Sequence, residues 1–471
     1  MELGPGGAIT PLPCPGRSAD SMAESKAARP DATWDVAIIG GGATGLAVAA
    51  RCLETGRRVV LFEREAAGGS LKQSQAADAL HQAAHRAALS GQPARQPVAA
   101  PAEDILAPFQ ARGLVVVPAS AHFIALDCLE AAGRTYSFRH AVIAAGSGPV
   151  VPDTYGLASV PWLLPEALPG LEEVPEHLLI LGGGRQAVEL AQTHALLGRR
   201  VSLVQSQPNI LPDHEMELVV PLREALRHCG VTLHENSAVA TVEHAGAGVA
   251  LVLEGGARLE GSHLVLALGQ APRLSPLDLA AAGIEATPAG VRVRQDLRST
   301  GNRRVWAVGS VADTGSAEPA PGQHAAVVAD AMLHGLQASL GPVAAPRLVR
   351  TLPALAQLGL TEAQARAAGH DPQVLRVPLP DGVAGPGMAK LVADGRGRLL
   401  GAGLMGEQAG EVAALLALAM SRNLAGPEIA ALPLPCGTAA ETVARAAGNL
   451  RGAEFTSTPM RRILGLLHRW Q

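Results

Sequence analysis

The fold of this chain is decided near its N-terminus by the stretch Val36-Ala37-Ile38-Ile39-Gly40-Gly41-Gly42-Ala43-Thr44-Gly45, an apolar run that enters a glycine-rich turn. Residues 46–56 are typical of a helix, Val59-Val60-Leu61-Phe62 is typical of a second strand, and Glu63 ends that strand. In such a turn the glycines admit a pyrophosphate to the backbone, the helix N-terminus offers N–H donors, and the acid accepts hydrogen bonds from ribose hydroxyls. The stretch therefore predicts a dinucleotide site.

A second turn of the same design follows the apolar run Leu178-Leu179-Ile180-Leu181 and reads Gly182-Gly183-Gly184-Arg185-Gln186-Ala187. A helical stretch continues to Leu197, the strand-like run Val201–Val204 follows, and Gln205 ends that run at the same offset as Glu63. One such turn alone is weak evidence. Two turns in complete strand–turn–helix–strand context predict two dinucleotides in an α/β chain.

Composition is consistent with this interpretation and excludes other classes. The 471 residues are enough for two to four domains, and a formal net charge of −4 with interleaved signs gives no reason to expect nucleic acid. No run reaches the roughly 18 apolar residues of a membrane-spanning helix, and no secretory signal pattern begins the chain. We therefore expect a soluble, cytoplasmic protein. The five cysteines show no CxxC spacing, so we predict no metal site and reduced, mostly buried thiols: Cys14, Cys52, Cys128, Cys229 and Cys436.

Changes in composition divide the chain. Pro, Gly, Ser and Ala without apolar periodicity predict disorder over 1–33. Buried strands that enter small-residue turns, at 140–147, 263–269 and 304–310, close the nucleotide units. We predict the following division: a disordered segment over 1–33, nucleotide units over 34–150 and 151–268, a return to the first unit over 269–340, a third domain over 345–450 and a separate tail over 451–471.

The arrangement resembles the flavoprotein disulfide reductase family, which includes dihydrolipoamide dehydrogenase, glutathione reductase and mercuric reductase. The motifs that carry the resemblance are Gly40-x-Gly42-x-x-Gly45 with Glu63, Gly68-Gly69-Ser70, Ala144-Ala145-Gly146-Ser147, Gly182-x-Gly184-x-x-Ala187-x-Glu189 and Leu358–Ala363. The resemblance implies two Rossmann-type domains, one for FAD (34–150 and 269–340) and one for NAD(P) (151–268). It also implies an α+β dimerisation domain over 345–450, and therefore a homodimer.

Site residues follow from the same resemblance. The positions that match FAD contacts are Gly40, Gly42, Ala43, Thr44, Gly45, Glu63, Gly69, Ser70, Ala145, Gly146, Gly309, Ser310 and Ala325. Those that match NAD(P) contacts are Gly182, Gly184, Ala187, Gln205 and Gly269. Glu189 is similar to the family's acid near the flavin edge, and Arg185 stands where the family often has a tyrosine that covers the nicotinamide pocket. These two are the expected catalytic residues.

The chain departs from the family where disulfide chemistry is concerned. Leu71 and Ala76 occupy the positions of the family's redox cysteine pair, so thiol–disulfide exchange has no thiolate there. Leu434 replaces the histidine of the family's His–Glu pair, and Ala439 stands at the glutamate position; Glu441, two residues further on, has no imidazole partner. The sequence therefore predicts that the protein is not a disulfide reductase.

Two cofactor positions also differ. Ser310 replaces the family's acid that accepts a hydrogen bond from the FAD ribityl chain, and a hydroxyl can still accept that bond. Neutral Gln205 removes the repulsion of a 2′-phosphate, and Ala187 in place of the third glycine favours NADPH as well. No arginine stands beside Gln205 in sequence, although Arg199 and Arg200 are nearby, so the preference for NADPH is slight and NADH stays open.

Other residues allow two interpretations. Arg185 is either a cationic gate or phosphate contact, or an exposed loop arginine. Lys72 and His81 follow the first turn and could reach the flavin, but we expect them to be solvated helix residues. We expect Cys436 to be a buried thiol, although a dimer would bring it near the partner's flavin. The basic, amphipathic stretch over 459–471 predicts a helix that docks on the dimer; the alternative is weak peripheral contact with a membrane.

Two functions follow. The first is an FAD-dependent NAD(P)H oxidoreductase that passes electrons directly from flavin to a small-molecule or redox-partner acceptor. A quinone, a dye, oxygen, a metal ion or a second nicotinamide would each serve. The alternative is a catalytically silent flavoprotein that keeps the dimeric fold as an interaction module.

Overall fold

The computed structural model describes residues 33–64, 69–90, 104–171, 175–315, 320–341, 345–382 and 385–450. The predictions for the N-terminal segment over 1–32 and the tail over 451–471 lie outside the described residues. The same holds for the side chains of 69–77, which include Gly69, Ser70, Leu71, Lys72 and Ala76, although their helix is described.

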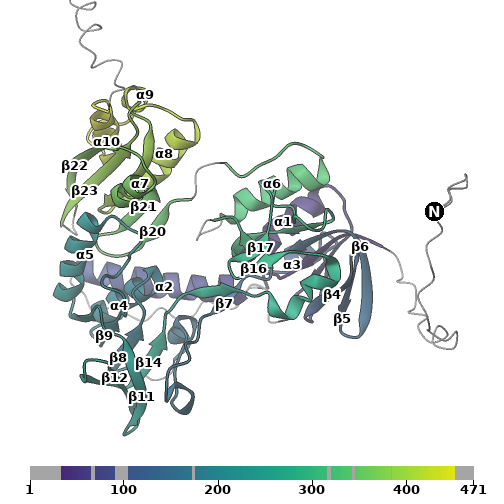
Figure 1. Cartoon of the computed structure of the whole chain (residues 1–471), viewed down its shortest axis with the longest axis horizontal. Coiled ribbons are helices and arrows are strands. Elements are labelled where there is room, and N and C mark those ends of the chain that lie inside the picture. The colour runs from purple at the N-terminus through teal and green to yellow at the C-terminus, as the bar shows by residue number, and fades with distance from the viewer. Residues whose placement is uncertain are drawn as a thin grey trace, which may run out of the picture.

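The first unit is built on a seven-stranded sheet (Figure 1). Its parallel part has the order β3 (Val115–Val117), β2 (Val59–Phe62), β1 (Trp34–Ile39) and β6 (Arg134–Ile143), with β18 (Val305–Ala307) also on β6. These strands are almost uniformly apolar, as strands buried on both faces are. β4 (Ala121–Ala125) and β5 (Cys128–Ala131) extend β6 as an antiparallel hairpin. Helices α1 (Ala43–Glu54) and α6 (Pro321–Leu333) pack together over the core that contains Trp306 and Phe62.

The second unit repeats this design with four parallel strands. Their order is β10 (Val231–His234), β9 (Arg200–Val204), β8 (His177–Leu181) and β14 (His263–Leu266). Helices α4 (Arg185–Leu196) and α5 (Met216–His228) share its core. An antiparallel sheet of β11 (Val239–Ala245), β12 (Gly248–Leu253) and β13 (Arg258–Gly261) packs on the other side.

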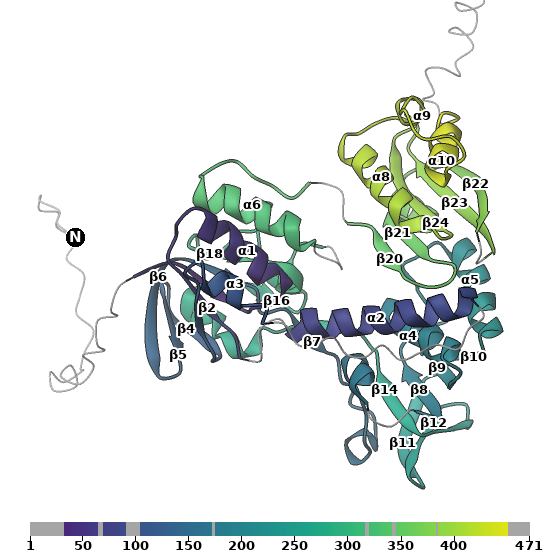
Figure 2. The same cartoon turned by 180° about the vertical axis from the view of Figure 1, so that it is seen from behind.

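Two connections join the units. β7 (Ser147–Pro149) pairs antiparallel with β15 (Gln270–Pro272) where the chain leaves the first unit and returns. Helix α2 (Gly69–Ser90) starts at the first unit and extends along the second, where it packs on α4 (Figure 2). Smaller elements complete this part: α3 (Ala107–Gln110), the sheet of β16 (Ala286–Thr287), β17 (Gly290–Arg292) and β19 (Ala312–Asp313), and short 3-10 helices at Leu157–Ser159, Pro165–Gly170, Ser275–Leu277, Leu279–Ala282 and Gly309–Val311.

The C-terminal domain carries a five-stranded antiparallel sheet. Its order is β20 (Arg347–Val349), β21 (Leu355–Gly359), β24 (Leu399–Met405), β23 (Gly385–Ala393) and β22 (Gln373–Gly382). The helices are α7 (Glu362–Ala367), α8 (Ala409–Ser421), α9 (Gly426–Ala430) and α10 (Ala439–Ala447), of which α8, α9 and α10 contribute buried residues to this domain's core.

The C-terminal domain and the second unit are joined by buried groups. Val349, Leu355 and Met405 belong to the apolar core of the second unit. Lys390, only 2% exposed, has its ammonium 2.9 Å from carboxylates of Glu215, Glu217 and Glu362. A buried charge is tolerated only with such partners. The two parts therefore form one packed body, as both views show (Figures 1 and 2).

In the part of the chain that the structure covers, no helix combines the length and apolar character needed to cross a membrane. The same residues bring together no cluster of three His, Cys, Asp or Glu side chains suited to a metal ion.

Candidate functional site

The first glycine turn lies between β1 and α1 and has no room for side chains. Gly40 has φ +108, and a Cβ there would lie 2.2 Å from the carbonyl oxygen of Ala144. A Cβ at Gly45 would lie 2.0 Å from the carbonyl oxygen of Gly40. Both positions therefore require glycine, because it alone permits this φ and this close approach of α1 to β1.

The N-terminus of α1 is open to a ligand. Its N-cap residue Gly42 offers no side-chain cap, so the N–H groups of the first turn at Ala43 and Thr44 are not satisfied by a capping side chain. Glu63, at the end of β2, accepts a 2.7 Å hydrogen bond from the Gly41 N–H and so lies against the same turn. These features fit a pyrophosphate and a ribose side by side.

Two adjoining cavities continue from this turn. One, of about 550 Å³, is lined by predicted FAD residues: Gly40, Gly42, Glu63, Ala145, Gly146 and Ser310. The other, of about 830 Å³, is lined by residues of α2, of the second unit and of the segment that returns to the first unit, including His81, Arg185, Glu189 and Gly269. Ser147, Glu166, Gln270 and Ser310 line both, so the cavities meet at these residues.

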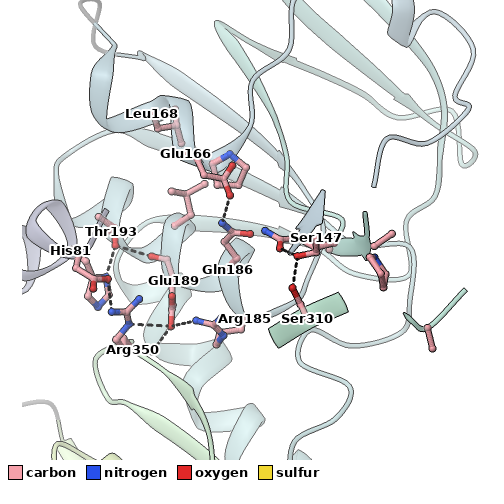
Figure 3. Close-up of a pocket in the computed structure, with 18 of the residues that line it drawn as sticks. His81, Ser147, Glu166, Leu168, Arg185, Gln186, Glu189, Thr193, Ser310 and Arg350 are labelled. Carbon is pink, nitrogen blue, oxygen red and sulfur yellow. Dashed lines mark hydrogen bonds and ion pairs between the residues drawn. The ribbon is translucent and has the colours of Figure 1, made fainter. Parts of the chain in front are cut away.

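Ser310 lines both cavities, and Figure 3 shows it beside Ser147 in the larger one. Its Oγ donates to Ser147 Oγ at 3.2 Å, and Ser147 in turn donates to the side-chain oxygen of Gln270. Because the single proton of Ser310 is engaged, its lone pairs remain for accepting a hydrogen bond. The Gly309 N–H donates to Nδ1 of buried His324, 3.1 Å away, and burial lowers the pKa of His324.

Two further residues predicted to contact FAD, Gly309 and Ala325, lie in different surroundings. Gly309 lies against the start of α1, since a Cβ there would be 3.2 Å from Thr44 Oγ1. Ala325 is buried in α6 and does not line either of the two cavities.

The second glycine turn, between β8 and α4, is looser than the first. Gly182 has φ +124, and a Cβ there would lie 2.2 Å from the carbonyl oxygen of Ala267. Ala187, at the position equivalent to Gly45, is fully buried and keeps its Cβ. Gly184 leaves the N-terminus of α4 without a side-chain cap. Gln205 lies against the turn, its side chain 2.8 Å from where a Cβ of Gly183 would be.

Three arginines of the second unit either pair with other side chains or lie at the far end of β9 from Gln205. Arg199 donates to Nδ1 of buried His194 at 2.5 Å, and burial, reinforced by Arg199, lowers the pKa of His194 to about 3. Arg200 begins β9, whereas Gln205 follows its end, so the strand separates them. Arg223 is paired with Glu235 at 2.7 Å. Arg199 and Arg200 therefore add nothing to the slight preference for NADPH that Gln205 and Ala187 indicated.

Glu189 is the centre of a charge cluster in the larger cavity (Figure 3). Its Oε1 accepts from the backbone N–H of Arg350 at 2.8 Å and lies 3.6 Å from Arg350 Nε and 3.7 Å from Arg185 Nη1. Arg350 also forms an ion pair with Asp78 of α2. Glu189 is 9% exposed, so these cations compensate a nearly buried carboxylate. Arg185 is half-exposed but pairs with Glu189 on the cavity wall.

His81 is not the solvated residue that we expected from the sequence. Its Nδ1 lies 2.7 Å from Thr193 Oγ1 on α4, and its ring contacts that of His85, with centroids 3.9 Å apart and the ring planes tilted by 51°. Burial, reinforced by Arg350, lowers the pKa of His81 to about 4, so the ring is neutral at neutral pH. The expectation fails because α2 packs on α4 here. The buried residues Leu80, Ala84 and Ala87 follow one helical face and could have indicated this packing.

Two further expectations concern the C-terminal region. Cys436 is exposed, so the prediction of a buried thiol is wrong; it lies in the loop before α10 and not in the domain core. Glu441 stabilises the start of α10, where it accepts from the Gly437 N–H at 3.2 Å and pairs with Arg445. Leu434 packs at the edge of the C-terminal core.

Two glycine turns of this geometry, each opening a helix and bordering adjoining cavities, are the arrangement of an oxidoreductase that binds two dinucleotides. Comparison with known proteins agrees. The family model described as pyridine nucleotide-disulphide oxidoreductase matches residues 34–331, and its dimerisation domain matches residues 345–447. The chain belongs to the pyridine nucleotide-disulphide oxidoreductase family, whose members are FAD-dependent and use NAD(P)H.

Similar proteins span almost the whole chain. A mercuric reductase of Streptomyces lividans is 31% identical over 88% of this chain and 95% of its own. A dihydrolipoyl dehydrogenase of Halobacterium salinarum is 26% identical over 89% of this chain and 96% of its own. Among solved structures, the HOCl-induced flavoprotein disulfide reductase RclA from Escherichia coli has a TM-score of 0.75 at 24% identity, covering 88% of this chain and 99% of that one. This last likeness concerns the fold.

Proposed function

We propose that this protein is an NAD(P)H oxidoreductase whose bound FAD passes electrons directly to a non-disulfide acceptor. The observation that carries the proposal is the ion-paired Glu189 in a cavity of about 830 Å³ that adjoins the FAD-type cavity at Ser310. Bound FAD supplies a ring that accepts a hydride from a nicotinamide and passes its electrons on. The described residues fit this group, because the cradle of Gly40 and Gly45 would be filled by any Cβ.

In this proposal the chain holds FAD through its backbone and through two side chains, those of Glu63 and Ser310. The uncapped N–H groups of α1 bind the pyrophosphate, and Glu63 accepts from a ribose. Ser310 accepts from the ribityl chain, with its own proton directed to Ser147. On the other side, α4 binds the nicotinamide nucleotide, and Glu189 with Arg185 orients the nicotinamide end in the larger cavity.

The acceptor is proposed not to be a disulfide, because of the residues present. Leu71 and Ala76 stand at the redox cysteine positions, and Leu434 stands at the histidine position. None of these side chains forms a thiolate or transfers a proton. Mercuric ion and lipoamide belong to relatives by name, and we expect neither to be turned over at rates typical of those enzymes. The acceptors that this proposal retains are a quinone, a dye, oxygen or a second nicotinamide.

We further propose NADH as the preferred donor, reversing the slight preference for NADPH drawn from the sequence. A 2′-phosphate needs a cation beside Gln205, and Arg199 and Arg223 are engaged with His194 and Glu235. The Gln205 amide can both accept from and donate to ribose hydroxyls.

The second candidate is a silent flavoprotein that serves as a dimeric interaction module. It is favoured by the concentration of departures at reactive positions: Leu71, Ala76, Leu434, Ser310 and Arg185. In either case we propose a homodimer through residues 345–447, the part that matches the dimerisation domain. Light scattering that gives the mass of one chain at micromolar concentration would contradict the dimer.

One experiment separates the two candidates. Purified protein, yellow with about one FAD per chain by our proposal, is mixed anaerobically with NADH and separately with NADPH. Bleaching of the visible flavin band supports the oxidoreductase, and faster bleaching by NADH supports the donor assignment. A flavin that stays oxidised with both supports the silent module.

A second assay tests the excluded substrates. Lipoamide, glutathione disulfide and mercuric ion are offered as acceptors to the same protein. Robust turnover would show that another thiol had taken over the chemistry. The variant Cys436→Ser then decides whether this exposed cysteine is that thiol.

A further inference from the structure

We infer that Arg350 is a positioning residue of the larger cavity. It fixes Glu189 of α4 and Asp78 of α2 relative to each other, and it does so from the edge of the C-terminal domain. The inference rests on the proposed function, in which Glu189 orients the nicotinamide. Through Arg350, the geometry around the nicotinamide in the larger cavity depends on the position of the C-terminal domain.

Arg350 joins three parts of the chain at one point. It directly follows β20, the first strand of the C-terminal sheet. Its backbone N–H and its Nε both approach Glu189 Oε1, at 2.8 and 3.6 Å, and its Nη1 pairs with Asp78 of α2. One arginine thus holds a carboxylate from each of two helices, as the left half of Figure 3 shows for Glu189.

The backbone around Arg350 is itself fixed to α4. The Leu352 N–H donates to Gln192 Oε1 at 2.7 Å, and Gln192 Nε2 donates back to the Leu352 carbonyl at 2.8 Å. Gln192 is fully buried, and Val349 lies in the core that α4 shares. The guanidinium therefore starts from a rigid anchor, which limits the positions that it reaches.

The contacts on Glu189 are one-sided. Arg350 N–H, Arg350 Nε and Arg185 Nη1 all approach the same oxygen, Oε1. This arrangement holds the carboxylate in one orientation and leaves Oε2 as the oxygen that accepts from a donor group of a bound nucleotide. Arg185 is the weaker partner, because its Nη1 lies 3.7 Å from Glu189 Oε1, the longest of the three distances.

Charge gives Arg350 a second effect. The cluster of Asp78, Glu189, Arg185 and Arg350 is balanced, with two carboxylates and two guanidinia. Removal of Arg350 leaves two carboxylates for one cation beside the nicotinamide end of the cavity. Glu189 is nearly buried, so the lost compensation also loosens the contact between α2 and α4.

The test compares three variants of the full-length, FAD-loaded protein. Arg350→Met keeps most of the side-chain volume but removes the guanidinium group. Arg350→Lys keeps the positive charge but lacks the planar guanidinium with its several N–H donors. Arg258→Met is the matched control, since Arg258 is an exposed arginine that also pairs with two carboxylates, Glu243 and Glu260, in the sheet of β11–β13. FAD content and mass are checked for each.

We expect Arg350→Met to slow flavin reduction at saturating NADH by about 10- to 100-fold, the scale of a misplaced reacting group. We expect the nucleotide concentration for half-maximal rate to change less than about threefold, because binding contacts elsewhere remain. Arg350→Lys should recover part of the rate, and Arg258→Met should match the natural protein. If Arg350→Met reduces its flavin as fast as Arg258→Met does, the inference is overturned.

A readout independent of turnover separates this inference from the proposed function. Amide hydrogen exchange of 78–90 in α2 should become at least about tenfold faster in Arg350→Met and stay unchanged in Arg258→Met. If neither nucleotide reduces the natural protein, the proposed function fails, while faster exchange would still support the positioning contact. Unchanged exchange would overturn the inference.

If Arg350→Met fails to fold, Asp78→Asn takes its place, because it removes only the α2 half of the contact. It should give the same two effects at smaller size. The inference would be overturned if Asp78→Asn showed the flavin reduction rate and the amide hydrogen exchange of the natural protein.

Discussion

The two glycine-rich turns share a backbone design but differ in how tightly each is closed. In the first, Gly45 lets α1 approach so closely that a Cβ would lie 2.0 Å from the Gly40 carbonyl oxygen. In the second, Ala187 at the equivalent position is buried with its Cβ in place. Glu63 accepts a hydrogen bond from the Gly41 N–H of the first turn. Gln205, at the corresponding position, packs with its side chain against Gly183 of the second turn. The first turn suits a resident cofactor, and the second suits a nucleotide that exchanges.

The largest effect is expected from Gly45→Ala. The added methyl group collides with backbone, so α1 must move, at a cost of about 2–3 kcal/mol in the free energy of unfolding. We expect the protein to be purified without FAD and not to take it up, as measured by the visible spectrum. Gly255→Ala, at a turn where a Cβ meets nothing within 4 Å, is the control. A fully yellow Gly45→Ala protein would show that the first turn is no tighter than the second.

A smaller effect is expected at the acid of the first turn. Glu63→Arg replaces an acceptor with a cation that cannot bond the Gly41 N–H or a ribose hydroxyl, and we expect FAD affinity to fall about 100-fold. Glu63→Gln keeps an acceptor and should cost about tenfold. The dissociation constants are measured by fluorescence titration of FAD-free protein. Equal affinity of Glu63→Arg and the natural protein would contradict the role of Glu63.

At the second turn, substitutions of Gln205 should alter the choice between NADH and NADPH and leave the retention of FAD unchanged. Gln205→Glu brings a carboxylate toward a 2′-phosphate, so the ratio of kcat/KM for NADH to that for NADPH should rise by about tenfold or more. Gln205→Arg should lower the same ratio, because it supplies the missing cation. FAD content should be unchanged in both. A ratio that both variants leave unaltered would place the adenosine ribose away from Gln205.

The smallest effect is expected from Ala187→Gly, which gives the second turn the residue of the first. Glycine in a helix costs about 1 kcal/mol in the free energy of unfolding, measurable by urea denaturation. NADH affinity should stay within about twofold. A large gain in affinity would mean that Ala187 holds α4 away from the nucleotide.

The sequence predicted the parts of the fold that have local signals. The strand–turn–helix–strand units at Gly40 and Gly182 were expected, and their strands and helices lie where the apolar runs placed them, because pattern and turn chemistry agree there. The family, its fold and its cofactors are confirmed by the comparisons. The hairpin of β4 and β5 and the sheet of β11–β13 were not expected, because their strands are short and partly polar.

The larger cavity was harder to predict. Glu189 and Arg185 follow from the motif, but Arg350 reaches Glu189 from a segment far along the chain that has no motif of its own. His81 was misjudged because it lies where α2 packs on α4; the apolar face of Leu80, Ala84 and Ala87 indicates that α2 packs on something, but it does not identify α4 as the partner. Lys390, a charged residue in the middle of an apolar strand, is explained only by carboxylates from Glu215, Glu217 and Glu362.

The sharing of cores across the chain has a consequence for synthesis. The first sheet needs β18, which is translated after the whole second unit, and the second unit needs Val349, Leu355 and Met405 from the C-terminal domain. Without Lys390, Glu215 would be left buried with its charge uncompensated. A nascent chain that ends near residue 341 therefore exposes an unfinished second core to solvent and to chaperones. The second unit is therefore complete only after residues up to Met405 have left the ribosome.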